Sequence, residues 1–319
     1  MSGGAPPGAA SDRAPKAAGA AGAAGTAEAF GAAAARRGRR PPFALHAVLA
    51  SLALAWAFPV AWAVYNSLRD YAYTSTHGYL SFGGFTLANY QNAWRQGGFA
   101  QGFANSLLIT VPAVALALLL ASSVAFVVAR FSRRSNVALL GLFTAANLLP
   151  QQALLVPLYR LYNELEVPFW LSESGKLYNS YWAVIVTHVA FQTGFCAFVL
   201  SNYMKSLPAE LTEAALVDGA GVVRQFWQII LPLCRPPLAA LATLEFTWVY
   251  NDFFWAVAFM SQGDKYPVTS SLQNLRGPFF TDYNLLSAGS VIAALPTLIV
   301  FFVLQRQFVA GLTLGAAKG

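Results

Sequence analysis

The sequence predicts an all-α membrane protein that crosses the bilayer with six helices. Of its 319 residues, 57% are hydrophobic and only 10% are charged, and the mean hydropathy is +0.51. A soluble domain carries about a quarter charged residues. Here the charged residues lie almost wholly between long apolar runs, and about 20 apolar residues are enough to cross a hydrocarbon core. The chain therefore belongs to the polytopic membrane proteins.

The N-terminal part of the chain is predicted to be a disordered tail. Residues 1–40 consist mainly of Ala, Gly and Pro with few large apolar side chains, so they cannot bury enough surface to offset chain entropy. Four arginines close this tail, and a first transmembrane helix follows over 41–68. Its apolar stretch, Phe43 to Tyr65, exceeds the 7 to 15 residues of a signal-peptide core. An uncleaved anchor is favoured over a signal peptide, including a twin-arginine signal.

Five further apolar runs complete the six predicted helices. In the second, Asn105 and Ser106 are candidate N-cap residues. Prolines interrupt the third and the sixth, where neighbouring helices or a water-filled cavity can satisfy the freed backbone groups. The runs span 105–129, 137–160, 181–203, 237–260 and 286–307.

Basic residues predict the orientation of the helices. With the tail inside, fourteen Lys and Arg residues fall on the inner side and six on the outer side. Cytoplasmic loops carry the excess of Lys and Arg. Both termini are therefore expected in the cytoplasm, in a multi-pass protein of the plasma (inner) membrane. The same placement explains the net charge of +7 without a nucleic-acid partner.

A polar segment between the fourth and fifth apolar runs is predicted to form a small bent knuckle. Pro208 ends the preceding helix, and a short helix to Val217 has carboxylates at its start, where the helix dipole favours them. Gly219 can take the left-handed conformation that ends such a helix. We expect Ala214, Ala215 and Leu216 to form a low apolar bump beside Glu213.

The spacing within this segment resembles the EAA loop of ABC importer permeases. The pattern is Glu-Ala-Ala, three residues, Gly, nine residues, Ile, one residue, Leu-Pro, and it is complete over Glu213 to Pro232. The resemblance implies that the loop 208–232 docks into a cleft of a cytoplasmic ATPase; the alternative is an ordinary cytoplasmic loop. The implied coupling residues are Glu213, Ala214, Ala215, Leu216, Asp218, Gly219, Ile229 and Pro232.

Polar residues inside the predicted helices mark a candidate translocation path. Charged groups are costly in a membrane and are expected to face a cavity or a partner helix. Glu245 and Asp252 are seven residues apart on the fifth helix, with Trp248 on the same face. Helix-to-helix hydrogen bonding is the alternative role. The candidate path residues are Asn147, Gln192, Glu245, Trp248, Asn251, Asp252 and Trp255, and His188 shares the face of Gln192.

A second resemblance concerns the type of permease. Asn251 to Trp255 is similar to the fifth-helix signature of maltose-type carbohydrate permeases, with Tyr250 where that family has Trp. The C-terminal sequence is similar to the ending of the second permease of such pairs. The resemblance implies the ABC transmembrane type-1 fold over 101–308 and a cytoplasmic tail, 309–319, that contacts the ATPase. The tail residues implied are Gln307, Gly311, Thr313 and Gly315.

The resemblance also implies a sugar importer with several partners. These are a second permease, a homodimeric or heterodimeric ATPase, an extracellular sugar-binding protein, the sugar and the lipid bilayer. The chain has no Walker-type phosphate loop, so it is expected to have no ATPase site of its own, and ATP would be bound by partner subunits. No metal-binding motif occurs, no cofactor is expected, and Cys196 and Cys234 are predicted to be free thiols.

Two other classes compete with this interpretation. A proton-coupled secondary transporter would use Glu245 and Asp252 as a proton relay, but it leaves the spacing of Glu213 to Pro232 unexplained. A membrane-embedded enzyme is disfavoured because no nucleophile, metal set or catalytic carboxylate pair stands out.

Overall fold

The computed structural model describes residues 43–131, 134–146 and 149–313. Within these ranges the chain is helical, with only isolated β-bridges between extended residues. It divides into two units, Met1–Val60 and Ala61–Gly319. The α-helices are α2 (Phe43–Ser67), α3 (Tyr71–His77), α4 (Ala88–Gln96), α5 (Phe99–Arg130), α6 (Arg134–Ala146), α7 (Leu155–Glu164), α8 (Tyr181–Ser206), α9 (Glu210–Val217), α10 (Val222–Gln225), α11 (Leu231–Leu233), α12 (Arg235–Tyr250), α13 (Phe254–Phe259), α14 (Val268–Ser271) and α15 (Tyr283–Thr313).

Long apolar helices are the main elements of the fold. Among the described residues, four helices are long and apolar enough to cross a membrane: α2, α5, α8 and the part of α15 up to Gln305. A fifth span results if Val222–Leu233 and α12, which meet at a bend of 75°, count as one. The all-α membrane fold is confirmed, but six uninterrupted helices are not reached.

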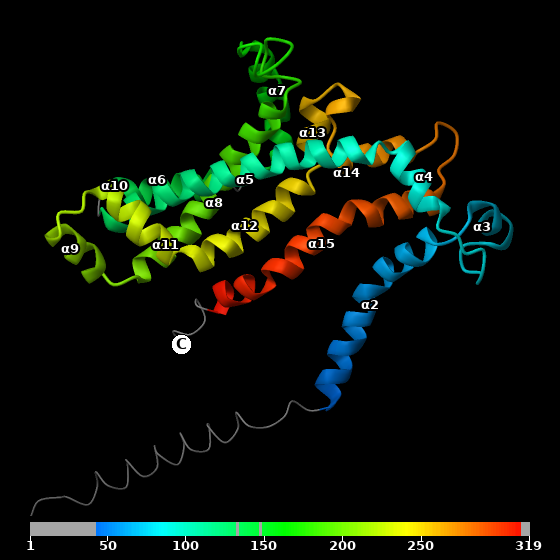
Figure 1. The fold of residues 1–319 in the computed structure, drawn as a ribbon, viewed down its shortest axis with the longest axis horizontal. Helices are drawn as coiled ribbons and strands as arrows, with labels where there is room; N and C mark the ends of the chain where they lie inside the picture. The colour runs from blue at the N-terminus through cyan, green and yellow to red at the C-terminus, as the bar shows by residue number, and fades with distance from the viewer. Residues whose placement is uncertain (1–42, 132–133, 147–148, 314–319) are drawn as a thin grey trace, which may run out of the picture. The chain divides into compact units, whose positions relative to one another are not determined.

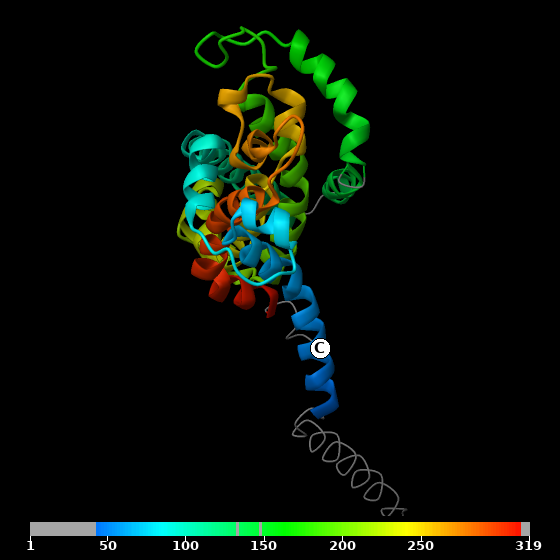
Figure 2. The ribbon, with the colours of Figure 1, turned by 90° about the vertical axis from the view of Figure 1, so that its right-hand side faces the viewer.

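The third predicted span is broken into two short helices. α6 and α7 have 13 and 10 residues, and between them Pro150 begins a 3-10 turn, Gln151–Leu154. Pro150 lacks a backbone donor and disfavours the helical conformation of the residue before it, which favours a break here, whereas α15 continues through Pro296. Figure 2 shows α7 at a steep angle to α6.

The fifth predicted span is also interrupted. α12 ends at Tyr250, and the short helix α13 begins only at Phe254. The second span starts earlier than predicted, because α5 begins at Phe99. Asn105 and Ser106 are therefore inside α5 and do not cap it. They bind the chain before and at α14: the Asn105 side chain donates to the Asp264 and Tyr266 carbonyls, and Ser106 Oγ accepts from the Val268 amide.

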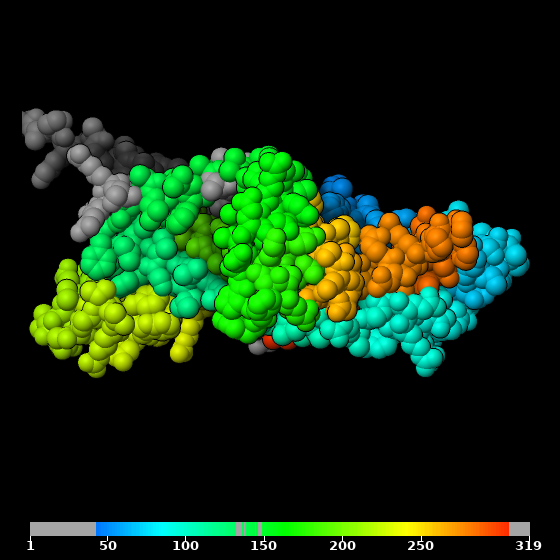
Figure 3. Space-filling model, turned by 90° about the horizontal axis from the view of Figure 1, so that it is seen from above, coloured from blue at the N-terminus to red at the C-terminus, as the bar shows by residue number. Residues whose placement is uncertain are grey.

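The core of the second unit lies where α5, α8, α12 and α15 run side by side (Figure 1). α5 contributes a stripe of alanines spaced by four residues, and all of them are buried. Such small residues let helix backbones approach closely in a membrane. The stripe consists of Ala113, Ala117, Ala121 and Ala125. Seen from above, the segment around α9 and the segment around α4 lie at opposite ends of this unit (Figure 3).

Candidate functional site

The segment 210–233, called the knuckle below, folds as the sequence predicts in its first half. α8 ends at Ser206, and α9 carries Glu210 and Glu213 in its first turn. Gly219 has φ +74°, and the Ala220 amide donates to the Ala215 carbonyl at 2.8 Å. The left-handed glycine thus ends α9 and reverses the chain.

The second half of the knuckle is anchored on α5. Phe226 begins a π-helical turn that runs to Ile230, and its ring lies 5.4 Å from that of Phe126 on α5. Gln225 is buried and donates from Nε2 to the Ala220 carbonyl at 2.8 Å. The first contact joins the second half of the knuckle to α5, and the second joins the two halves of the knuckle to each other.

The exposed apolar surface of the knuckle differs in part from the expected one. Ala214 and Leu216 are exposed beside Glu213, but Ala215 is 5% exposed and packs inward, because the chain reversal covers its side of α9. Ile229 and Pro232 are half-buried. The large apolar residues that the knuckle exposes are Leu211, Leu216, Val217, Val222, Val223, Trp227 and Leu233.

A second feature is a cavity of about 630 Å³ at the break between α12 and α13. Its walls combine amide and hydroxyl groups with aromatic rings. Among its lining residues that the structure describes, only His188 and Asp252 can carry a charge. The cavity is lined by Gln151, His188, Phe191, Gln192, Thr247, Trp248, Asn251, Asp252, Phe253, Phe254 and Trp255.

The Asp252 side chain makes several contacts at the break between α12 and α13. Its carboxylate accepts hydrogen bonds from the Trp255 and Ala256 amides at 3.3 and 3.2 Å, and so caps α13. His188 Nε2 lies 3.6 Å from Oδ2 of the same carboxylate, an ion pair when the imidazole is protonated. The Asp252 carboxylate therefore lies between the N-terminus of α13 and the imidazole of His188.

Two further contacts fix the break to neighbouring elements. Asn251 Nδ2 donates to the Thr247 carbonyl and to Thr297 Oγ1 on α15. Thr269 Oγ1, on α14, donates to the Asp252 carbonyl at 2.6 Å. The backbone groups freed by the interruption are partly satisfied in this way, as a break at membrane depth requires.

The structure places most of the predicted path residues at this cavity. Gln192, Trp248, Asn251, Asp252 and Trp255 line it, although Trp255 is only 1% exposed and stacks on Phe191 and Phe259.

Glu245 is not among the residues that line the cavity. It is fully buried and accepts a hydrogen bond from Cys196 Sγ at 3.1 Å. Its predicted alignment with Asp252 is wrong, because α12 ends at Tyr250 and the helical register stops there. The two carboxylates therefore have different surroundings.

As predicted, Cys196 and Cys234 are free thiols.

Some predicted positions lie outside the described residues. They are Asn147, Gly315 and the side chains of Gln307 and Thr313; α15 itself continues through Gly311 to Thr313. Conversely, sequence reasoning missed the roles of Phe191, Thr269 and Thr297. Phe191 follows His188 by three residues on the same helix face and could have been found by its spacing. No spacing in the sequence relates Thr269 or Thr297 to these residues.

The described residues thus form a helical membrane protein with a polar cavity at a helix break and a compact knuckle at one end of its second unit. The chain matches the family described as binding-protein-dependent transport system inner membrane component over residues 81–313. This match covers most of the chain, and the chain belongs to that family. It is thus a permease subunit of an ABC importer.

Named relatives agree with this assignment. The alpha-glucoside transport system permease protein of Rhizobium meliloti is 37% identical over 236 residues, which is 74% of this chain and 61% of that protein. The diacetylchitobiose uptake system permease protein of Streptomyces coelicolor is 31% identical over 288 residues, 90% of this chain and 92% of that protein.

A solved structure shows the same fold. A bacterial ABC transporter involved in the import of the acidic polysaccharide alginate contains a chain with a TM-score of 0.66 and 20% sequence identity, covering 83% of this chain and 95% of that one. The fold is therefore the type-1 fold of ABC importer permeases.

Proposed function

We propose that this permease subunit imports a sugar or oligosaccharide across the plasma membrane. The observation that carries the proposal is the cavity at the break between α12 and α13. A sugar presents hydroxyl groups and faces of C–H bonds, so its path needs amides and aromatic planes with few formal charges. Gln192, Asn251 and Trp248 provide these groups, and the charge of Asp252 faces His188. Two relatives are named for glucoside and diacetylchitobiose transport.

The knuckle is proposed to couple this path to ATP hydrolysis by a partner subunit. Its exposed Leu216, Val217 and Val223 offer an apolar surface beside Glu213, suited to a groove on a protein. The 75° bend joins the knuckle directly to α12, and α12 ends at the cavity. A displacement of the knuckle would therefore be transmitted along one helix to Asn251. Closure of the ATPases would move paired knuckles together and turn the shared cavity from inward to outward facing.

The remaining partners follow from this arrangement. A second permease would complete the cavity, and an extracellular binding protein would release sugar into it. The chain itself binds no ATP in this proposal and needs no cofactor. The excess of Lys and Arg supports cytoplasmic termini, with the knuckle on the side where ATP is available.

The sugar proposal is tested by uptake into vesicles that contain the assembled transporter. Neutral oligosaccharides, a uronate oligosaccharide and a polyamine are offered in turn with the cognate binding protein. We expect ATP-dependent uptake of a neutral oligosaccharide. We also expect Gln192→Ala to raise the sugar concentration needed for half-maximal uptake. Uptake of the polyamine alone would refute a sugar path.

The coupling proposal is tested by charge reversal at two positions of α9. Glu213→Lys and Glu210→Lys both remove a carboxylate from the first turn, so they lose the same favourable interaction with the helix dipole. We expect Glu213→Lys to abolish uptake and ATPase stimulation while the protein stays in the membrane. Glu210→Lys is the control and should retain most activity. Equal effects of the two changes would remove the case for a specific contact at Glu213.

A further inference from the structure

The segment between α2 and α5 is organised around a buried arginine. Arg69 is fully buried, and its guanidinium donates to the Gly83 and Tyr79 carbonyls at 3.0 and 2.7 Å and to Ser81 Oγ at 2.6 Å. Its carbon Cζ lies 5.1 Å from the centroid of the Tyr65 ring and 5.6 Å from that of Tyr73. A basic residue that follows a membrane span is thus turned inward and presents no charge on the surface.

The loop held by Arg69 has a defined shape. Gly83 and Gly84 have φ values of +125° and +69°, and a Cβ on Gly84 would lie 2.5 Å from the Tyr73 ring. The Tyr73 hydroxyl donates to the Phe82 carbonyl at 2.9 Å. The backbone of the loop therefore lies directly against the Tyr73 ring. Its large apolar side chains point away: Leu80 and Phe82 are 85% and 80% exposed, and Phe85 and Leu87 are also exposed.

This segment is tied to the ends of membrane spans. It follows α2, which ends at Ser67, and precedes α5, which begins at Phe99. Thr74 Oγ1 donates to Asn284 Oδ1 at the start of α15, and Asn284 Nδ2 donates to the Asn66 carbonyl. Figure 1 shows α3 and α4 beside the first turns of α15. The exposed apolar residues thus lie beside the ends of helices that are long and apolar enough to cross a membrane.

The composition of the segment is unusual for a surface in bulk water. From Tyr71 to Trp94 the sequence contains no Asp, Glu, Lys or Arg. It contains seven aromatic residues, Tyr71, Tyr73, Tyr79, Phe82, Phe85, Tyr90 and Trp94. Aromatic side chains concentrate at the boundary between hydrocarbon and water, where Tyr and Trp place an apolar body and a polar end.

We propose that the loop 78–87 is a membrane anchor, with Leu80, Phe82, Phe85 and Leu87 inserted into the headgroup and upper acyl layer of the leaflet at the carboxyl end of α2. Burial of Arg69 keeps its charge away from the exposed face of the loop, and residues 71–94 add no Asp, Glu, Lys or Arg that would oppose insertion. The occupant of this face is lipid and not a second protein, because the face adjoins the ends of lipid-crossing helices. The anchor fixes the height of α2, α5 and α15 relative to the leaflet.

Spin labels at two positions test the proposal in the assembled transporter. Phe82→Cys and Leu80→Cys are labelled in lipid nanodiscs, with cysteine-free partner subunits and without binding protein. The native thiols, Cys196 and Cys234, are buried. Collision rates with oxygen, which partitions into lipid, are compared with those of a water-soluble nickel chelate. Leu52→Cys in the middle of α2 is the lipid control, and Lys176→Cys is the aqueous control.

We expect positions 80 and 82 to keep high oxygen accessibility and to lose nickel accessibility relative to position 176. Nickel accessibility equal to that of position 176 would overturn the proposal, since the loop would then lie in water. Low accessibility to both reagents would overturn it as well, because the face would then be covered by another subunit. Two labelled positions guard against the failure of one variant to assemble.

Discussion

At the scale of single residues, two tryptophans of the cavity have different surroundings. Trp248 is 47% exposed, and its ring lies 5.8 Å from that of Phe195. Trp255 is 1% exposed and lies between Phe191 and Phe259, with ring centroids 5.7 and 5.1 Å away. The same residue type is therefore exposed at the cavity at one position, where we propose that it contacts the transported sugar, and forms a core contact at the other.

Replacement of each tryptophan by alanine should separate these roles. Trp255→Ala leaves a large void in the core, which costs about 3 to 5 kcal/mol. We expect it to lower the melting temperature and the yield of assembled complex. Trp248→Ala should assemble normally and raise the sugar concentration needed for half-maximal uptake. Melting curves and uptake measured on the same preparations compare the two, and identical behaviour would contradict the assignment.

Gly219 and Gly221 form another informative pair of residues. A Cβ would meet no atom within 4 Å at either position, yet Gly219 has φ +74° and Gly221 has φ −65°. A left-handed conformation costs a non-glycine residue roughly 1 to 2 kcal/mol. Gly219→Ala should therefore distort the knuckle and reduce ATPase stimulation, whereas Gly221→Ala should be neutral. A loss of stimulation in Gly221→Ala alone would contradict this account.

Sequence spacing predicts which side chains share a helix face only where one continuous helix joins them. Spacing correctly grouped His188 with Gln192, because both lie within the continuous helix α8. It failed for Glu245 and Asp252, because the helix that would relate them ends at Tyr250. The inward position of Ala215 results from the chain reversal that covers it, and a local pattern does not reveal such tertiary packing.

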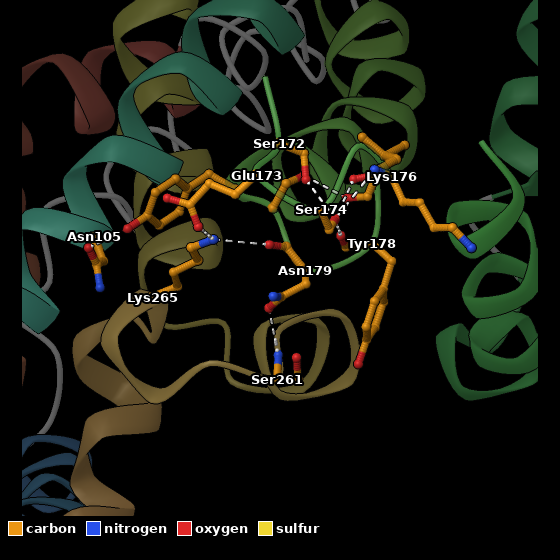
Figure 4. A network of polar contacts seen from close by, with 12 residues as sticks. Asn105, Ser172, Glu173, Ser174, Lys176, Tyr178, Asn179, Ser261 and Lys265 are labelled. Atoms are coloured by element: carbon orange, nitrogen blue, oxygen red, sulfur yellow. Dashed lines mark hydrogen bonds and ion pairs between the residues drawn. The ribbon is translucent and has the colours of Figure 1, made fainter. Parts of the chain in front are cut away.

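At the scale of elements, the loops between helices are joined by a polar network (Figure 4). Asn179, with φ +60°, accepts from the Ser261 amide through Oδ1, and Lys265 pairs with Glu173 at 2.9 Å. Asn105 joins this network to α5: it is fully buried, and Tyr181 donates to its Oδ1 at 2.8 Å. The sequence predicts Asn105 as a helix cap and gives no sign of its three long-range partners, which are more than 70 residues away.

The buried and exposed members of this network should contribute unequally to stability. Asn105→Ala removes the hydrogen bonds of a fully buried side chain and leaves its partly buried partners unsatisfied, and a fully buried group left so would cost about 1 to 3 kcal/mol. Glu173→Gln removes an ion pair whose carboxylate is 79% exposed, and such pairs contribute about 0 to 1 kcal/mol. We expect a clear fall in melting temperature for the first variant and almost none for the second. A larger fall for Glu173→Gln would show that the ion pair holds the loops together.

At the scale of the whole molecule, composition was sufficient to predict a helical membrane protein, and motif spacing predicted its family. The interruptions of the third and fifth spans were harder to predict. Pro150 marks the first of them, but the second lies at Asn251 to Phe253, where no proline occurs and the Asp252 carboxylate begins a new helix. Hydropathy averages over such a break and reports one continuous span.

The proposed orientation is open to a direct test with exposed cysteines. Val223→Cys on the knuckle should react with a membrane-impermeant maleimide only when the cytoplasmic face is accessible. Lys176→Cys and Phe279→Cys, both at exposed positions, should react from the opposite face in intact cells. The buried native thiols give a low background. Reaction of Val223→Cys in intact cells would reverse the orientation and exclude contact of the knuckle with a cytoplasmic ATPase.

The alanine stripe of α5 has a mechanical consequence. Methyl groups at Ala113, Ala117, Ala121 and Ala125 project too little to interlock with side chains of a neighbouring helix, so they form a nearly smooth track. Shear motion consists of small sliding steps between packed helices, and large interdigitated side chains resist it. In this protein, close packing and ease of sliding have the same origin, the smallness of one side chain repeated at every fourth position.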